Sequence, residues 1–294
     1  MLIKRSENSF PDFKTIKGKY FGDTMISKDK FSLSKNIINK ALEFGASLAG
    51  IVNIEDLKKS PSHVISTKIA NFEGVGTKNI KGRKRGEVQW IDNAKSGVVI
   101  AIEHPREKPE LDFWTKGLNG GTKGNFKLIS TFSKLADWIE KDNQINCIKL
   151  AYHIERGAVY MKDAAVFAGI GCIGKNNIII TREFGPKVRL RVMLLDIDLP
   201  STGILDFDPC IECEEYCKKA CPQNAFDTKL YTESESGLKH LPSRTGWYNR
   251  IQCNIQMEKD AENAKDVIIE GNNFNSQEVR YCRRCEFSCP VGKS

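Results

Sequence analysis

The sequence predicts an α/β domain followed by a separate cysteine-rich, metal-binding module. Apolar, strand-like segments alternate with helical patterns over the first two thirds of the 294 residues, which is typical of an α/β domain. Eight of the ten cysteines, in contrast, lie between residues 210 and 289. Disulfides would be spread over the fold that they stabilise, whereas this clustering indicates a local metal site. We therefore expect a polar arm at 1–33, an α/β domain at 34–202 and the cysteine module at 203–294.

The elements of the α/β domain follow from local patterns. Ser34 can cap a helix whose apolar positions repeat with helical spacing, and Gly45 can end it. Polar residues from 58 to 94 predict a long loop with short helices. A second helix, with an apolar stripe from Leu128 to Ile139, follows a glycine-rich stretch. Segments rich in apolar residues predict five strands, at 47–54, 97–102, 147–154, 177–181 and 189–198.

Composition excludes some classes of protein. The sequence contains no apolar run of 18 residues, which excludes a membrane-spanning helix. Its first residues form neither an apolar leader nor a paired-arginine export signal, so we expect a cytoplasmic protein. The 45 Lys and Arg residues outnumber 37 Asp and Glu, and the net charge of +8 mildly favours acidic partners. In a cytoplasmic chain, many cysteines indicate metal or redox chemistry.

The spacing of the cysteines predicts two iron–sulfur clusters in a ferredoxin-like module. The runs read Cys210-x2-Cys213-x3-Cys217-x3-Cys221-Pro222 and Cys282-x2-Cys285-x3-Cys289-Pro290. In the bacterial ferredoxin run C-x2-C-x2-C-x3-C-P, three thiolates hold one 4Fe–4S cluster and the fourth binds the other cluster. This rule predicts two sets of four ligands, namely Cys210, Cys213, Cys217 and Cys289, and Cys221, Cys253, Cys282 and Cys285.

The runs depart from the ferredoxin pattern in two respects. One residue too many separates Cys213 from Cys217, and the last run needs the isolated Cys253 as its fourth ligand. The alternative is a four-cysteine zinc site made from the two C-x2-C pairs. That reading would leave four cysteines and both C-x3-C-P tails unexplained. In either case Cys147 and Cys172 are interpreted as residues outside the metal sites.

A glycine motif, Gly169-Ile-Gly171-Cys-Ile-Gly174, matches the dinucleotide-binding pattern G-x-G-x-x-G. That pattern needs a strand before it and a helix after it. Here a helix-like segment, KDAAVFA, precedes the motif and a strand-like segment follows it. The order is reversed, so a dinucleotide site is not predicted.

The chain resembles the cobalamin-dependent iron–sulfur reductases, a group that contains the reductive dehalogenases and the epoxyqueuosine reductases of tRNA maturation. The resemblance lies in AGIGCIGKNNIIITREFGPKVRLRVMLLDIDLP (168–200), followed by the two cysteine runs. That group carries an A-G-L-G-x-x-G-[KR]-N segment, an I-x-P-E-F-G-like turn, R-L, and a T-D-L-P-L-like strand. ALEFGASLAGIVNIEDL (41–57) is also similar to the group's first helix and strand. The resemblance covers roughly residues 34–290.

The resemblance implies a nitroreductase-like domain that holds a base-off cobalamin, fused to a ferredoxin-like domain with two 4Fe–4S clusters. The clusters would pass electrons from an external low-potential donor, of the ferredoxin or flavodoxin type, to cobalt. The matching motif implies cofactor binding by Gly169, Gly171, Gly174, Lys175 and Asn176. Lys175 could instead stabilise a substrate anion or be a solvated residue of a turn.

The proton donor is placed less directly by the resemblance. Epoxyqueuosine reductases have an acidic donor thirteen residues before the motif's alanine, and counting back from Ala168 gives Glu155. The alternative for Glu155 is a surface ion pair with a neighbouring arginine or lysine. Dehalogenases use a tyrosine at a place that falls on Asn125-Phe126 in this chain. Because no tyrosine lies there, the possible substitutes are Tyr152, His153 and Tyr160.

Three functions are consistent with these observations. The leading prediction is a corrinoid-dependent, dehalogenase-like reductase that acts on a small organic molecule. The first alternative is an epoxyqueuosine reductase-like enzyme acting on tRNA, with the basic run KGRKRG (81–86) as a phosphate contact. The second alternative is a non-catalytic iron–sulfur electron carrier. The substrate itself is not encoded in any motif of the sequence.

Overall fold

A four-stranded sheet organises the first domain of the computed structural model, which describes residues 24–67, 81–118, 121–230, 232, 234, 246–269 and 274–292. The strand order is β1-β2-β7-β4, and all three ladders are antiparallel. The strands are β1 (Leu48–Asn53), β2 (Ser96–Glu103), β4 (Cys147–Lys149) and β7 (Val188–Leu195). The predicted alternation of strands and helices is therefore found, but the helices do not connect parallel strands.

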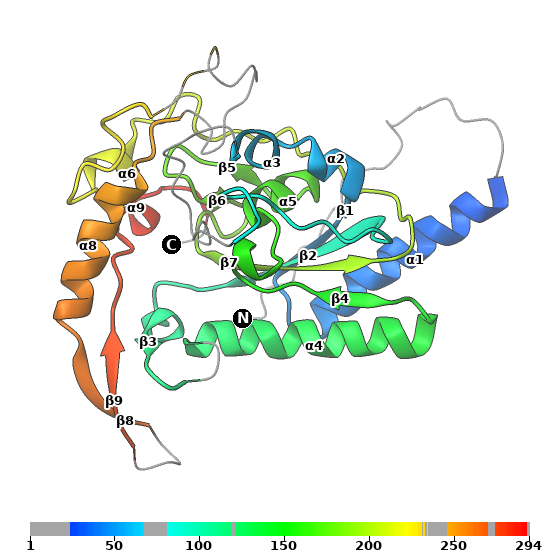
Figure 1. Ribbon diagram of the computed structural model, residues 1–294, viewed down its shortest axis with the longest axis horizontal. Coiled ribbons are helices and arrows are strands. Elements are labelled where there is room, and N and C mark those ends of the chain that lie inside the picture. Colours follow the sequence, from blue (N-terminus) through cyan, green and yellow to red (C-terminus); the bar gives the residue numbers. More distant parts are fainter. Residues whose placement is uncertain are drawn as a thin grey trace, which may run out of the picture.

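Helices cover both faces of this sheet, as Figure 1 shows. On one face lie α1 (Thr24–Glu43) and α4 (Lys123–Asn143). On the other lie α2 (Ile54–Lys58) and α5 (Met161–Phe167), with α3 (Pro61–Ile65) beside α2. The domain is thus a three-layer structure with apolar packing on both sides of the sheet.

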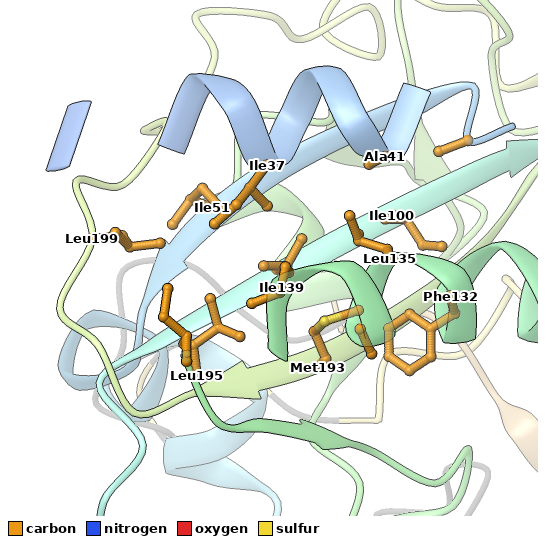
Figure 2. Packing of buried hydrophobic residues seen from close by; sticks show 14 of the residues in the cluster. Ile37, Ala41, Ile51, Ile100, Phe132, Leu135, Ile139, Met193, Leu195 and Leu199 are labelled. Atoms are coloured by element: carbon orange, nitrogen blue, oxygen red, sulfur yellow. The ribbon is translucent and has the colours of Figure 1, made fainter. Parts of the chain in front are cut away.

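The central strand β2 is buried on both faces because its successive side chains point in opposite directions. Ile100 packs toward α1 and α4, whereas Val99 and Ala101 pack toward α2 and α5. Figure 2 shows the first of these clusters, in which Ile37 of α1 and Leu135 of α4 pack against the same face of the sheet. An uninterrupted apolar run in the sequence therefore corresponds to a strand between two helical layers.

Residues 68–80 of the predicted loop lie outside the described residues; within these, the predicted elements agree with the structure except at the start of the domain and in two strands. The first helix begins at Thr24, not at Ser34, which lies buried within α1. Residues 24–33 contain no glycine or proline, so nothing local ends the helix before the predicted cap. The predicted arm is thus partly helical, and residues 1–23 lie outside the described residues.

Two predicted strands are shorter than expected. The run 147–154 forms only the three-residue β4 and then turns into the short 3-10 helix η3 (Ile154–Arg156). The run 177–181 supplies β6 (Ile179–Ile180), which pairs with β5 (Cys172–Ile173) in a small hairpin. The glycine motif therefore joins α5 to a β-hairpin, and this helix-then-strand order confirms that it is no dinucleotide fingerprint.

The cysteine module lies beyond one end of the sheet, at the left of Figure 1. Its helices are α6 (Tyr216–Lys219), α8 (Arg250–Glu262) and α9 (Arg284–Phe287), and its strands are β8 (Lys265–Ile269) and β9 (Phe274–Val279). Strand β9 pairs with β3 (Trp114–Thr115), a segment of the preceding domain next to the 3-10 helix η2 (Pro109–Asp112). A three-stranded antiparallel sheet with strands from both regions therefore fastens the module to the first domain.

In the described part of the chain, no helix is both long and apolar enough to span a membrane.

Candidate functional site

Four cysteines from both runs line a single cavity. The cavity is bounded by Cys210, Cys213, Cys217 and Cys289, the set expected for the first cluster. Burial, together with the neighbouring thiols, raises the pKa of Cys217 to about 11. Four thiolates cannot stay ionised side by side without a cation to neutralise them. This donor set therefore fits a cationic iron–sulfur core.

A second group of cysteines gathers three separate segments. Cys253 in the first turn of α8 lies close to the last cysteine run. The thiols of Cys253 and Cys282 both interact electrostatically with the Cys285 thiol. Burial and these two neighbours raise the pKa of Cys285. Cys221, the fourth predicted member, accepts a hydrogen bond from the Ala225 amide at 3.3 Å. Its membership of the second set stays a prediction.

The spacing of the possible metal ligands bears on the zinc alternative. Among the described residues, no three His, Cys, Asp or Glu side chains are spaced to hold a single metal ion. A zinc ion would draw four sulfurs to within about 2.3 Å of one point, whereas the irons of a cluster lie at separate corners. The two assignments therefore differ in how close the four sulfurs must lie to one point.

Lys175 and Asn176 lie against the cysteine loops. The Nζ atom of Lys175 is 2.9 Å from Oε1 of Glu215, and both residues line the first cavity. The hydrogen bond from Lys175 lowers the pKa of Glu215. Buried Asn176 donates from Nδ2 to the Cys285 carbonyl at 3.4 Å and accepts from the Ile178 amide. The hairpin that follows the glycine motif thus touches both groups of cysteines.

The three glycines of the motif are accounted for by packing of the chain on itself. A Cβ atom at Gly169, where φ is +66°, would lie 2.6 Å from the Gly203 carbonyl oxygen. At Gly171 it would collide with the carbonyl oxygen of Ile180, and at Gly174 with the side chain of Ile180. Only glycine permits these approaches. Their contact with a corrinoid stays a prediction.

Glu155 lies in η3 with one carboxylate oxygen buried. Its Oε2 atom has no hydrogen-bond partner in the described structure. The surrounding segment is held by Arg83, which donates to the Ile154 carbonyl at 3.2 Å and to the Glu155 carbonyl at 3.5 Å. The first arginine of KGRKRG is therefore engaged in positioning this segment. One carboxylate oxygen of Glu155 is therefore open to a hydrogen bond from a bound ligand.

The tyrosine substitutes separate into two environments. Tyr160 donates to the Gly86 carbonyl at 2.8 Å, and burial raises its pKa to about 12, so it is engaged in the core. Tyr152 is half exposed and lies under the Arg191 guanidinium, 5.4 Å from the ring centre. Arg191 also donates to Oδ1 of Asn125 at 2.7 Å. The fold thus brings Tyr152 near the place that lacks the expected tyrosine, and His153 packs edge-on against it.

An ion-pair network at the domain junction was missed by the sequence analysis. Asp112 Oδ2 lies 2.6 Å from Arg283 of the last cysteine run, and Asp112 Oδ1 lies 2.9 Å from Arg189 of β7. Both arginines also contact buried Glu286, and His104 completes the network through Asp112 at 2.9 Å. Burial alone would raise the pKa of Asp112, but these partners lower it. The network could not be predicted from the sequence, because its members come from four segments that are far apart in the chain.

The chain was compared with known proteins. No family model matches it. It is 25% identical over 271 residues to an epoxyqueuosine reductase from Lactococcus garvieae, covering 89% of this chain and 70% of that protein. It is 24% identical to one from Prochlorococcus marinus over 284 residues, covering 90% and 79%. A tetrachloroethene reductive dehalogenase from Dehalobacter restrictus matches at 30% over 93 residues, covering 29% and 16%.

Solved structures of epoxyqueuosine reductases have a similar fold. The Streptococcus thermophilus protein superposes with a TM-score of 0.57 at 21% identity, covering 88% of this chain and 66% of that chain. A structure with an epoxyqueuosine-modified tRNA stem loop gives a TM-score of 0.57 at 20% identity, covering 88% and 65%. A third, from Bacillus subtilis, has a catalytic aspartate loop swung out of its active site and a TM-score of 0.53. This chain spans about two thirds of the length of these structures.

These findings change the order of the predicted functions. The match to a dehalogenase is confined to a third of the chain, whereas the matches to epoxyqueuosine reductases extend over nearly nine tenths of it. The preference for the dehalogenase-like branch is therefore not supported, and the first alternative fits better. The homologues of this chain are epoxyqueuosine reductases, with reductive dehalogenases as more distant relatives.

Proposed function

We propose that this protein is an iron–sulfur, corrinoid-dependent reductase of the epoxyqueuosine reductase type, acting on a modified nucleoside of tRNA. The observation that carries the proposal is the cavity lined by four cysteines from runs about 70 residues apart. The similarity to epoxyqueuosine reductases over nearly nine tenths of the chain supports this type of reductase over others with iron–sulfur clusters.

The first cluster would be held by the four cavity cysteines, and the second by Cys221, Cys253, Cys282 and Cys285. An electron donor outside this chain would reduce them one electron at a time. Two buried polar atoms of the first domain, Oε2 of Glu155 and Nε of Arg191, have no partner among the described residues and fit a bound ligand rich in hydrogen-bonding groups, as a corrinoid is. When bound, the corrinoid supplies a low-potential metal that can reduce an organic substrate.

The reaction can be balanced with groups that the proposal names. Removal of an epoxide oxygen as water, leaving an alkene, consumes two electrons and two protons. The two clusters supply the electrons, and one proton comes from Glu155 while the other comes from water. Arg83 fixes the backbone on which Glu155 is carried, so the carboxyl group stays in a defined position. The catalytic aspartate loop of the Bacillus subtilis relative supports an acidic residue in this role.

Anaerobic reconstitution with iron and sulfide tests the cluster assignment. We expect about eight irons per chain and an absorbance spectrum typical of 4Fe–4S clusters. Cys217→Ser should lose about half of the iron, whereas Cys147→Ser, a cysteine outside both sets, should keep all of it. Bound zinc, with two irons or fewer, would show that the cluster assignment is wrong.

Addition of cobalamin and substrate tests the reaction. The reconstituted protein should retain cobalamin through gel filtration and reduce epoxyqueuosine in a tRNA stem loop. Retention of cobalamin with turnover of a small halogenated molecule only would favour the dehalogenase-like reading. Eight irons without retained cobalamin would leave the electron-carrier alternative.

The role of Glu155 is tested by a conservative change. Glu155→Gln should abolish turnover without loss of iron or cobalamin, because the amide keeps the shape and cannot release a proton. Arg83→Met should lower kcat and leave iron and cobalamin content unchanged. Unchanged turnover in Glu155→Gln would remove this residue from the mechanism.

A further inference from the structure

The first cysteine run departs from the ferredoxin spacing between Cys213 and Cys217. Three residues lie between these cysteines, where the ferredoxin run has two. Glu215, the middle one of the three, adopts the left-handed backbone conformation, with φ at +57°. Its carbonyl oxygen accepts the amides of Lys218 at 2.9 Å and Lys219 at 3.2 Å. The longer spacer is therefore accommodated by a turn at the start of α6, and Cys217 lies in α6 at the wall of the cavity.

The side chain of Glu215 meets a lysine of the first domain at this cavity. The left-handed conformation is unfavourable for a residue with a Cβ atom, and glycine adopts it freely. Glu215 nevertheless makes a defined contact from it, since its Oε1 atom lies 2.9 Å from Nζ of Lys175. Both residues line the cavity together with the four cysteines. The departure from the ferredoxin spacing thus places an ion pair beside the first set of thiols.

Lys175 is carried by a well-fixed turn between β5 and β6. Within this turn, Oδ1 of Asn176 accepts the amide of Ile178 at 3.1 Å. From α5, Lys162 donates to both the carbonyl oxygen and the side-chain oxygen of Asn177, each at 2.7 Å. The backbone that carries Lys175 is therefore held before the ion pair forms, so less conformational entropy is lost in forming it.

The other lysines near Glu215 have carboxylates of their own. Lys218 and Lys219 also act electrostatically on Glu215. Their Nζ atoms lie 3.6 Å from Asp227 and 3.5 Å from Glu214, respectively. The side chains of Lys219 and Glu214 are 64% and 68% exposed, whereas those of Glu215 and its partner lysine are 42% and 25% exposed. Water screens an exposed pair more strongly, so the less exposed pair has the greater influence on a group in the cavity.

We propose that the Lys175–Glu215 ion pair sets the reduction potential of the first cluster. Reduction adds one electron, and hence one negative charge, to the cluster, so nearby charges change its potential. The Lys175 ammonium favours the reduced cluster, and the Glu215 carboxylate favours the oxidised one. The inference rests on the cluster assignment within the proposed function and needs neither the corrinoid nor the RNA. It gives Lys175 a role in electron transfer in place of the cofactor contact that the resemblance implies.

A redox titration of the reconstituted protein, followed by EPR, tests this role. Lys175→Met should make the reduction of one cluster about tenfold less favourable, a shift of about 59 mV to more negative potential for one electron. Glu215→Gln should shift the same cluster in the opposite direction. The signal that is lost in Cys217→Ser identifies that cluster as the first. The double variant has the net charge of the original protein, so its potential should return close to the original value.

Three features separate the carboxylate from other influences. Glu215→Gly allows the left-handed backbone but lacks the carboxylate, so it should shift the potential as much as Glu215→Gln. Glu214→Gln is the matched control, because it removes the neighbouring carboxylate of the more exposed pair. It should change the equilibrium constant for reduction by less than about twofold. Lys187, which acts electrostatically on Cys289, is present in every variant and does not affect the comparison.

The proposal is wrong if Lys175→Met keeps eight irons and both original potentials, or if Glu214→Gln shifts the potential as much as Glu215→Gln. Loss of cobalamin from Lys175→Met with unchanged potentials would assign this lysine to the cofactor instead. If Lys175→Met does not hold the first cluster, Glu215→Gln and Glu215→Gly still measure the shift.

Failure of the proposed function gives a different result. Shifted potentials in a preparation that does not reduce epoxyqueuosine in a tRNA stem loop would refute the proposed function and leave the role of the ion pair standing. Bound zinc in place of iron would refute both.

Discussion

The α/β domain and the cysteine module are held together in different ways. In the first domain, apolar side chains fill both faces of the sheet, and every residue of β2 except the last is buried. In the module, only five hydrophobic residues of the described part are buried. Its longest helix, α8, buries none of its residues. Those five are Cys210, Cys217, Ala225, Phe226 and Val279.

The comparison teaches that the module depends on its ligands and its neighbour. A segment with so little apolar burial cannot offset the entropy of ordering its backbone. Its other contacts include the cysteines around a cavity, the pairing of β9 with β3, the ion pair of Asp112 with Arg283, and a close approach between two glycines. Gly185 follows Phe184 in the turn after β6, and its amide touches Gly292 near the chain's C-terminal end.

The largest expected effect comes from removal of iron. Chelation under anaerobic conditions should unfold the module, because cluster binding supplies much of its folding free energy. Limited proteolysis should then cut after the junction at residues 201–203 and leave a protected fragment that contains the α/β domain. Equal protection of both regions after chelation would contradict the comparison.

A smaller effect is expected at the contact between the two glycines. Gly185→Ala should destabilise the protein by about 2–4 kcal/mol, because φ is +57° and the new Cβ would collide with the Val291 carbonyl oxygen. Since Val291 lies two residues after Cys289, the variant should also lose iron from the first cluster. Denaturant unfolding and iron analysis measure both effects.

Gly157→Ala is the matched control for that change. Gly157 also has a positive φ, +93°, but a Cβ atom there meets nothing within 4 Å. It should cost about 1 kcal/mol and leave the iron content unchanged. Equal losses in the two variants would mean that backbone strain, and not the contact with the module, explains the result.

The smallest expected effect is a pH dependence confined to the first domain. Burial lowers the pKa of His63 to about 3. The Tyr160 amide donates to Nε2 of His63, so the neutral ring carries its proton on Nδ1, facing the Ser60 hydroxyl, which in turn donates to Asp163. Between pH 6.5 and about 3 the unfolded chain binds a proton that the folded one does not. Stability should therefore fall, by up to about 1.4 kcal/mol per pH unit, as the pH falls through this window.

His63→Gln isolates this contribution. Denaturant unfolding should give a shallower pH slope for this variant than for the original protein, while His153→Gln should keep the original slope. Burial raises the pKa of Asp163, and above pH 3.8 this opposes the loss of stability caused by His63. Asp163 is present in the original protein and in His63→Gln. The quantity to compare is therefore the difference between their pH slopes. Identical slopes would mean that His63 does not control the acid stability of this domain.

Much of the fold could be predicted because its signals are local. The strands β1, β2 and β7 follow from apolar runs, and α4 follows from a helical stripe. The start of α1 could not be placed, because a serine that can cap a helix is equally compatible with its interior. The short β4 was overestimated because the apolar residues after Lys149 pack in a turn and not in a strand.

The candidate site also has features that could be predicted from local sequence and features that could not. The cysteine spacing indicated which thiols belong together in the first cavity, since loop geometry is fixed by a few intervening residues. The glycine motif was recognised, but its packing against Gly203 and Ile180 was not, because those partners lie elsewhere in the chain. Arg191 carried no signal at all, as arginine within an apolar strand is indistinguishable in sequence from a solvated edge residue.

The sequence by itself determined the layers of the first domain and the two cysteine runs, because periodicity and short spacings act over a few residues. Only the tertiary structure decided which charges are compensated. Asp112 and Glu286 neutralise Arg189 and Arg283, while Arg191 donates to the neutral Asn125 amide and lies over the Tyr152 ring. Electrostatic pairing depends on distance in space, and residues far apart in the chain become neighbours only when the sheet, α8 and the last cysteine run pack together.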